Sequence, residues 1–345
     1  MKKKVLIAGG GGFIGGHMAE YLVKQGYWVR VVDVKFDNFI KRKFYDEKVT
    51  LDLRDLNNCL TALMGVDEVY QFAADMGGIG YITSNHATLA RNNILINANM
   101  LEACTILGVL KIFYSSSACV YPNFKQTKAD VISLKEEDAM PADPNEIYGW
   151  EKLFSEQLYK AYEQDRHMEV RIARFHNVFG EEGTYKDGKE KAPAALCRKI
   201  ANAVLTGSLK IDVWGDGKQT RSFMHVKDVC EGIYTLMESK HSEPLNLGSD
   251  RLIAIDDLAK LIFDIAKVKC KIKHDLTKPV GVRGRNSDNT KCRRVLGWEP
   301  KVSLEEGLIT TYEWIKGKIK EDLKRTKSGS LADAHMRDHI GGSKL

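Results

Sequence analysis

The sequence has little of what marks the special classes of protein. Its seven cysteines are an odd number, stand far apart and include no C-x-x-C pair, which argues against a disulfide framework and a structural zinc site. No apolar run approaches the roughly 20 residues that a membrane span needs. Seven prolines among 345 residues, with no internal repeat, exclude a fibrous or low-complexity chain. The expectation is a soluble globular protein with reduced thiols.

The chain also has little excess charge of either sign. The 52 Lys and Arg residues exceed the 46 Asp and Glu residues by a formal charge of +6, spread along the chain. No series of aromatic residues interleaves the basic runs, so an anionic small molecule is a better partner than nucleic acid. The nine histidines show no metal-ligand spacing, and His176 is expected to be a hydrogen-bonded residue of the core or a pocket. We therefore predict no metal site, no nucleic-acid partner and no membrane partner.

Strand-like and helix-like segments alternate through the first half of the chain. This order predicts an α/β fold with a doubly wound parallel sheet of the Rossmann type in residues 1–180. A smaller α/β lobe that binds the substrate is expected in residues 181–324, with the option that the chain crosses back to the sheet, and a flexible tail in residues 325–345. The expected strands are 5–8, 28–34, 49–53, 68–73, 110–116, 169–174, 211–214 and 245–247. The later helices are expected at 89–107, 150–164 and 192–205, with a closing helix that begins near Leu304.

The motif Gly9-x-x-Gly12-x-x-Gly15 stands between the first expected strand and the first expected helix. Glycines there allow a tight turn and let backbone N–H groups and the helix N-terminus approach a pyrophosphate, with Phe13 and Ile14 inside the motif. Asp33 ends the second strand, where a carboxylate bonds the adenosine ribose and repels a 2′-phosphate. The pattern predicts an NAD site, and Lys35 nearby keeps NADP as the alternative.

The spacing Tyr148-x-x-x-Lys152 puts a phenol and an ammonium on one face of a helix. There Lys152 is expected to lower the pKa of Tyr148 toward neutrality, so that Tyr148 acts as a general base. A serine-rich stretch, 115–119, ends the fifth strand at the edge where open α/β sheets bind ligands, and Ser117 is expected to hold the substrate oxygen. Together these are the parts of a hydride-transfer site.

These motifs, together with Phe72-Ala73-Ala74, Arg221-Ser222-Phe223 and residues 246–249, resemble those of the extended short-chain dehydrogenase/reductase family. The resemblance covers nearly the whole chain. It implies a Rossmann-type fold, NAD as cofactor and a nucleotide sugar as substrate. It also implies a homodimer that pairs through the helices expected at 89–107 and 150–164.

Further stretches are similar to the members of that family that invert carbons of GDP-mannose; they are 76–80, 116–122, 174–177, 190–195, 214–221 and 281–288. The resemblance implies that C4″ of the mannose is oxidised, C3″ and C5″ are inverted, and the ketone is reduced again to give GDP-L-galactose and GDP-L-gulose. Cys119 and Lys191 are the implied base and acid. A thiol at position 119 fits this chemistry, because part of it can be thiolate near neutral pH, where Ser or Thr cannot serve as a base.

The resemblance also assigns contacts with the nucleotide sugar. An arginine fork suits diphosphate oxygens, and we prefer Arg285 to Arg283 for that role while both stay open. Asp52, after the third strand, is expected either to approach the adenine or to cap a turn. The full set of implied substrate contacts is Gly77, Ser117, Ala118, Cys119, Asn177, Glu190, Lys191, Ala192, Lys199, Gln219, Thr220, Arg221, Arg283 and Arg285.

Other interpretations stay open at this point. Taken alone, Cys119 could be a buried structural thiol and Lys191 a solvated loop charge. A nucleotide-sugar 4-epimerase, 4,6-dehydratase or decarboxylase begins with the same oxidation. A 4,6-dehydratase, however, typically carries Asp-Glu where Ala118-Cys119 stands, and a 4-epimerase needs no thiol base. The alternative of another class is a catalytically silent regulator that binds NAD.

The expected location is the cytoplasm. Residues 1–8 lead directly into a strand-like segment rather than into the apolar core of a signal peptide. The chain ends in Ser343-Lys344-Leu345, which matches a peroxisomal address and gives that organelle as the alternative in a eukaryote.

Overall fold

The structure of the protein, a computed structural model, describes residues 2–36 and 44–340, with side chains described as far as Arg325. Its main sheet has seven parallel strands in the order β11-β6-β5-β4-β1-β2-β3. Short apolar runs form the central strands because both faces of a doubly wound sheet are covered by helices. The strands are β1 (Lys4–Ala8), β2 (Trp28–Asp33), β3 (Glu47–Thr50), β4 (Glu68–Gln71), β5 (Lys111–Ser117), β6 (Glu169–Phe175) and β11 (Leu245–Leu247). The predicted Rossmann-type sheet is confirmed.

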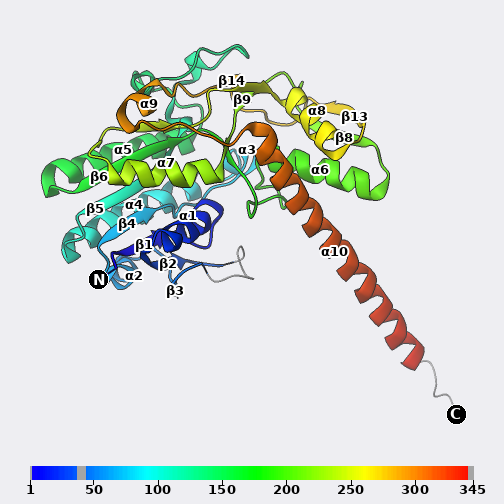
Figure 1. Ribbon diagram of the computed structural model, residues 1–345, viewed down its shortest axis with the longest axis horizontal. Helices are drawn as coiled ribbons and strands as arrows, with labels where there is room; N and C mark the ends of the chain where they lie inside the picture. Colours follow the sequence, from blue (N-terminus) through cyan, green and yellow to red (C-terminus); the bar gives the residue numbers. More distant parts are fainter. Residues whose placement is uncertain (1, 37–43, 341–345) are drawn as a thin grey trace.

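Helices pack on both faces of this sheet (Figure 1). Helices α1 (Phe13–Lys24) and α7 (Val226–Glu238) lie side by side over one face and share its apolar core. Helices α2 (Leu56–Leu63), α4 (His86–Leu107) and α5 (Ile147–Arg166) cover the other face with a second core. The sheet is therefore the middle of three layers, and the carboxyl ends of its strands meet at one edge, where ligands bind in such folds.

A smaller lobe sits beyond that edge. Its core joins α6 (Ala192–Thr206), α8 (Ile255–Ala266) and the first turns of α10 (Leu304–Ile340) with the strand pair β8 (Lys210–Trp214) and β13 (Lys271–Asp275). Shorter elements connect the lobe to the sheet. They are α3 (Ile79–Ile82), η1 (Ala118–Val120), η2 (Asn123–Lys125), η3 (Glu136–Ala139), β7 (Val178–Phe179), β9 (Thr220–Ser222), β10 (Met224–His225), β12 (Leu252–Ala254), β14 (Gly284–Arg285) and α9 (Thr290–Leu296).

The lobe is not one continuous stretch of chain. After β10 the chain returns to the sheet, adds α7 to the first face and pairs β11 with β6, so that Leu245 lies opposite Ala173. Leu245 and Leu247 are fully buried there, because they pack with α7 in the apolar core on this face of the sheet. The strand predicted at 245–247 thus belongs to the Rossmann sheet. The chain crosses back to that sheet, which was one option of the predicted domain division.

The closing helix is longer than the apolar spacing predicts. Leu304, Leu308, Tyr312 and Ile315 are buried in the lobe core as predicted, but α10 continues to Ile340 and projects away from the body (Figure 1). The helix therefore covers residues 325–340 of the segment predicted as a flexible tail, which corrects the predicted end. The physical reason is composition, since this stretch contains Ala, Leu, Lys, Arg and Met and no proline to stop a helix. The tripeptide Ser343-Lys344-Leu345 lies outside the described residues.

Candidate functional site

The glycine motif forms a turn with no room for side chains. Gly9 has φ +82°, and a Cβ on it would lie 2.6 Å from the backbone nitrogen of Ala73. A Cβ on Gly15 would lie 2.2 Å from the carbonyl oxygen of Gly9. Helix α1 begins after Gly12, whose glycine N-cap offers no side chain to its first N–H groups. Backbone N–H groups at the positive end of a helix are therefore exposed to a ligand, which fits a pyrophosphate.

Asp33 lies next to this turn, at the end of β2. Its Oδ2 accepts a hydrogen bond from the backbone N–H of Gly11 over 3.0 Å. Burial raises the pKa of its carboxyl group, and the backbone N–H groups of Lys35 and Gly11 oppose that rise. Phe13 and Ile14 pack against the core beneath the turn. The carboxylate and the glycine turn thus stand together, as a ribose and a pyrophosphate require.

Asp52 has a local partner. Its carboxylate accepts hydrogen bonds from the backbone N–H and from the guanidinium of Arg54, two residues later, and these bonds lower the pKa of Asp52. The guanidinium also reaches Asn92 on α4. These contacts support the turn-cap interpretation of Asp52, while its approach to an adenine stays a prediction.

The predicted catalytic residues Ser117 and Cys119 lie where β5 ends and η1 begins. The Ser117 hydroxyl accepts a hydrogen bond from the backbone N–H of Cys119 over 3.1 Å, and this bond caps the short helix. The half-buried Cys119 thiol lies 3.2 Å from Nη1 of Arg285, which comes from β14 in the distant C-terminal part of the chain. The sequence predicted both residues in the site but not this contact.

The surroundings of Cys119 favour its thiolate. Burial alone would raise the pKa of the thiol, but the charge of Arg285, hydrogen bonds from Ser117 and Arg285, and the charge of Lys191 together lower that pKa below its ordinary value. Five of the other six cysteines are buried and have a raised pKa because burial is not offset. Such surroundings are typical of functional thiols, and the catalytic role of Cys119 stays a prediction.

Lys191 stands at the N-cap of α6 and lines the same cavity as Cys119. Its side chain is exposed into that cavity. Desolvation by the surrounding protein lowers the pKa of the ammonium, the Cys119 thiolate raises it, and the nearby Arg285 lowers it, with a net lowering. The structure thus brings together the predicted base and acid, which are 72 positions apart in the sequence.

Tyr148 and Lys152 lie on α5 as predicted, but the expected effect of one on the other is wrong. Burial of the phenol, together with the charges of Cys119 and Glu151, raises the pKa of Tyr148 well above its ordinary value. The Lys152 ammonium lies 5.7 Å from the ring centre of Tyr148 and 4.8 Å from that of Tyr114, and it donates to the carbonyl oxygen of Ser115 over 2.9 Å. Burial lowers the pKa of Lys152, and the charge of Glu151 opposes this.

A buried polar cluster under Lys152 was not predicted. The Glu151 carboxylate accepts hydrogen bonds from Asn93 on α4 over 3.1 Å and from Ser155 over 3.0 Å. It thereby ties the helix that carries Tyr148 to α4. The sequence signal for this cluster is limited to the position of Glu151 beside Lys152, because the partner amide of Asn93 is 58 residues away.

One cavity of about 340 Å³ joins these groups to the lobe. Tyr148, Ser117, Cys119 and Lys191 line it together with most of the predicted substrate contacts. Those contacts are Gly77, Ala118, Asn177, Glu190, Ala192, Lys199, Gln219, Arg221 and Arg285. The predicted contacts that do not line it are Thr220, whose hydroxyl donates to the Ala129 carbonyl, and Arg283.

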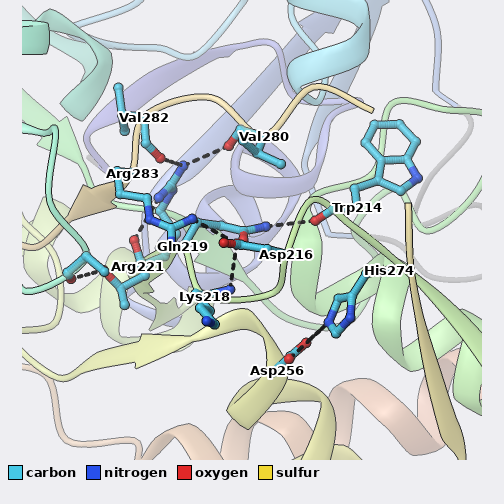
Figure 2. Close-up of polar contacts among 12 residues, drawn as sticks. Trp214, Asp216, Lys218, Gln219, Arg221, Asp256, His274, Val280, Val282 and Arg283 are labelled. Carbon is cyan, nitrogen blue, oxygen red and sulfur yellow. Dashed lines mark hydrogen bonds and ion pairs between the residues drawn. The ribbon is translucent and has the colours of Figure 1, made fainter. Parts of the chain in front are cut away.

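Figure 2 shows five residues that form one wall of this cavity, together with some of their neighbours; the five are Trp214, Gln219, Arg221, Val280 and Val282. Nε2 of Gln219 donates to the Trp214 carbonyl over 2.9 Å. The Arg221 guanidinium donates to the carbonyls of Val280 and Val282, and its burial, with the charge of Arg285, lowers its pKa to about 9.

Arg283 instead pairs with Asp216 over 2.8 Å on the outer side of that wall (Figure 2). The choice between Arg283 and Arg285 as the diphosphate partner stays a prediction. The structure gives Arg285 a second function, as the partner of the thiol.

Two side chains that line the cavity each carry a buried, unpaired acceptor. Oε1 of Gln219 and Oε2 of Glu190 have no hydrogen-bond partner within the described part of the chain. The other oxygen of Glu190 accepts from Arg198 over 2.6 Å, and Lys199 donates to the Asp212 carbonyl over 2.6 Å. Buried polar atoms without partners are costly, so these two oxygens mark an unsatisfied stretch of the cavity wall.

Among the described side chains, which end at Arg325, no group of three acidic, histidine or cysteine residues could hold a metal ion. In residues 2–36 and 44–340 no helix is long and apolar enough to cross a membrane.

A doubly wound sheet with a glycine turn, a Tyr-Lys helix and a lobe that closes a cavity over them defines a class of NAD-dependent sugar-nucleotide enzymes. The sequence profile of the NAD dependent epimerase/dehydratase family matches residues 5–248, and the chain belongs to this family. The turn and Asp33 fit its cofactor, NAD, because Gly9 and Gly15 let the backbone turn tightly at the start of a helix and the turn holds a carboxylate suited to a ribose beside it.

Particular relatives are similar along nearly the whole chain. The GDP-mannose 3,5-epimerase of Arabidopsis thaliana is 45% identical over 329 residues, which are 95% of this chain and 86% of the relative. GDP-mannose 3,5-epimerase 1 of Oryza sativa subsp. japonica is 46% identical over 93% of this chain and 84% of its own length. Among solved structures, a UDP-glucose 4-epimerase of Thermotoga maritima superposes with a TM-score of 0.83 at 25% identity, covering 92% of this chain and 99% of that one.

Proposed function

We propose that this chain is a GDP-mannose 3,5-epimerase that converts GDP-D-mannose to GDP-L-galactose and GDP-L-gulose. The observation that carries the proposal is the Cys119 thiol, which lies in the cavity with Tyr148 and Lys191 and whose pKa is lowered by the charges around it. Oxidation at C4″ alone needs no such base. The similarity to the plant 3,5-epimerases supports the same reaction.

NAD, when bound at the glycine turn, would supply a reversible hydride acceptor for oxidation at C4″. Tyr148 and Ser117 are the groups of this chain that bind the C4″ oxygen. Tyr148 must enter this step as phenolate to accept the proton of that hydroxyl as hydride leaves C4″, and burial, which raises its pKa, makes the phenolate a strong base. This suits a cycle without net redox change, in which the same proton must return when the ketone is reduced.

Cys119 and Lys191 then act on the carbons beside the ketone. A carbonyl at C4″ acidifies the hydrogens at C3″ and C5″, so a thiolate can remove one of them. Lys191 reaches the cavity from the start of α6, whereas Cys119 reaches it from η1. A base and an acid that come from separate elements can serve the two faces of the ring, and inversion requires both faces.

The test is incubation with GDP-mannose in D₂O, followed by NMR of the hexose. Deuterium at C3″ and C5″ with inverted configuration is expected, and Cys119→Ala should abolish it while Cys270→Ser, which changes a thiol of the lobe outside the cavity, retains it. Inversion at C4″ alone, or release of a 4-keto-6-deoxy sugar, would instead place the chain with the 4-epimerases or dehydratases. Binding of NAD without turnover of any nucleotide sugar would favour a silent regulator.

We also propose that the protein is a homodimer that pairs through α4 and α5. The support is the outer face of α5, where Ile147, Trp150 and Phe154 follow each other at helical spacing and are 37%, 44% and 51% exposed. Large apolar side chains gathered on one helix face are typical of an interface.

We propose the cytoplasm as the place of action. The support is that all seven cysteines are free thiols, which suits a reducing compartment. An import assay with and without residues 343–345 tests this, since loss of peroxisomal import on deletion would favour the alternative.

A further inference from the structure

Gln126 is a fully buried amide in the turn that follows η2, with 0% of its surface exposed. Its Nε2 donates to the carbonyls of Tyr121 and Pro122 over 3.0 and 3.1 Å. These two residues directly follow η1, the short helix that carries Cys119. The nitrogen end of the amide therefore holds the chain on the thiol side of the site.

The oxygen end of the same amide holds the opposite side. Oε1 of Gln126 accepts a hydrogen bond from Nε of Arg285 over 2.6 Å. The backbone carbonyl of Gln126 also accepts from the N–H groups of Arg283 and Gly284 over 2.9 and 3.2 Å. Gln126 thus fixes both the position of β14 and the orientation of the Arg285 side chain.

The guanidinium held in this way ends at the thiol, with Nη1 of Arg285 3.2 Å from Sγ of Cys119. We propose that Gln126 is a positioning residue that holds the Arg285 guanidinium against the Cys119 thiol. It touches no reacting atom itself and acts through Arg285. The role of the thiol in turnover rests on the proposed function, but the contact that Gln126 maintains does not.

A glutamine is the side chain that this position requires. It must donate to two carbonyls and accept from a guanidinium at once, and an amide has both capacities. A glutamate would set its carboxylate against the two carbonyls and would neutralise the charge of Arg285. A methionine of similar size would remove three buried hydrogen bonds, those to the Tyr121 and Pro122 carbonyls and that from Nε of Arg285.

Several charged and titratable groups face Cys119 from the surrounding elements. They are Arg285 from β14, Lys191 from α6, Arg221 from β9, and Tyr148 and Lys152 from α5. Arg285 is the strongest influence that opposes the effect of burial on the thiol pKa. Displacing its guanidinium should therefore raise that pKa, even though the other groups stay in place.

The experiment follows the alkylation of Cys119 by iodoacetamide between pH 5 and pH 10, with the peptide that contains Cys119 quantified by mass spectrometry. Only the thiolate reacts, so the midpoint of the rate against pH reports the thiol pKa. Gln126→Met should move the midpoint upward and slow alkylation at pH 7 about tenfold, since one pKa unit changes the thiolate fraction by that factor. Asn97→Leu removes another buried amide with three hydrogen bonds and should leave the midpoint unchanged.

A double-mutant cycle with Arg285→Met decides whether Gln126 acts through the arginine. Gln126→Met should have no further effect on the thiol midpoint once Arg285 is methionine. An unchanged midpoint in Gln126→Met, or an equal shift with and without Arg285, would overturn the proposal. If Gln126→Met does not fold, Gln126→Glu, which keeps the shape, enters the same cycle and should also raise the midpoint.

The result is separate from the identity of the reaction. Alkylation reports the thiol whether or not GDP-mannose is turned over, so the positioning role and the proposed function can fail independently. Where both hold, kcat for the epimerisation in Gln126→Met should fall and its acid limb should move to higher pH along with the alkylation midpoint.

Discussion

At the scale of single residues, the pKa values of the site depend on how far nearby charges offset the effect of burial. Cys119 and Tyr148 share one cavity, and burial raises the pKa of both. Arg285 and Lys191 stand near enough to the thiol to reverse that effect, whereas the Lys152 ammonium is bound to the carbonyl of Ser115 and does not reverse it for the phenol. The result is one thiol whose pKa is lowered and one phenol whose pKa is raised.

The pH dependence of kcat/KM follows from these directions. Turnover needs Cys119 as thiolate, so activity should fall as the pH drops through a thiol pKa that lies below the ordinary 9.0. It also needs Lys191 as ammonium, so activity should fall again as the pH rises through a lysine pKa below the ordinary 10.5. A bell-shaped profile is expected in initial rates measured by NMR or chromatography of the products.

Arg285→Met provides the matched variant for that profile. The acid limb should move to higher pH, because the main charge that lowers the thiol pKa is gone. An acid limb that stays in place would mean that another group controls it.

At the scale of elements, the turn between β1 and α1 shows how backbone geometry creates a binding site. The turn leaves no space for a Cβ at Gly15, where the Gly9 carbonyl lies 2.2 Å away. In contrast, Gly317 in α10 has no atom within 4 Å of such a Cβ. The same residue type is therefore required in one helix and dispensable in the other.

Gly15→Ala should weaken NAD binding about tenfold or more, because forcing a methyl group into this turn costs roughly 1–3 kcal/mol and displaces the N–H groups. Retained cofactor can be measured by chromatography after denaturation, and affinity by titration calorimetry. Full NAD occupancy in Gly15→Ala would contradict the site described for the turn.

Gly317→Ala is the matched glycine substitution, and it should raise the free energy of unfolding by about 1 kcal/mol through helix propensity. NAD content should be unchanged. Thermal unfolding of the two glycine variants, run side by side, separates the steric requirement for glycine in the turn from the general effect of glycine on helix stability.

At the scale of the whole molecule, the cavity exists because a discontinuous lobe closes over the edge of a sheet. The chain leaves the sheet after β6, returns for β11 and leaves again. The segments that form the cavity are therefore anchored on the core of the same sheet. The outer face of α5 lies on the opposite side of the helix from Tyr148 and Lys152, which are buried against the body. Pairing through that face would leave the cavity accessible.

Trp150→Asp combined with Phe154→Glu should therefore convert a dimer to a monomer. Light scattering coupled to gel filtration would give a mass near that of one chain, 38.8 kDa, in place of twice that value. Leu276→Lys, at a residue 74% exposed on the lobe, is the control and should leave the dimer intact. A wild-type protein that already runs as a monomer would refute the pairing.

The sequence by itself determined the parts whose signals are local. The glycine motif with Asp33, the Tyr148-Lys152 spacing and the β-α alternation are each contained in a few turns or strands, so short-range patterns predict them. What only the tertiary structure decided is how distant segments meet: Arg285 against Cys119, Gln126 between Arg285 and the chain after Cys119, and β11 in the first sheet. The physical reason is that hydrogen bonds, burial and charge depend on distances in space, and chain spacing does not specify these for residues more than a hundred positions apart.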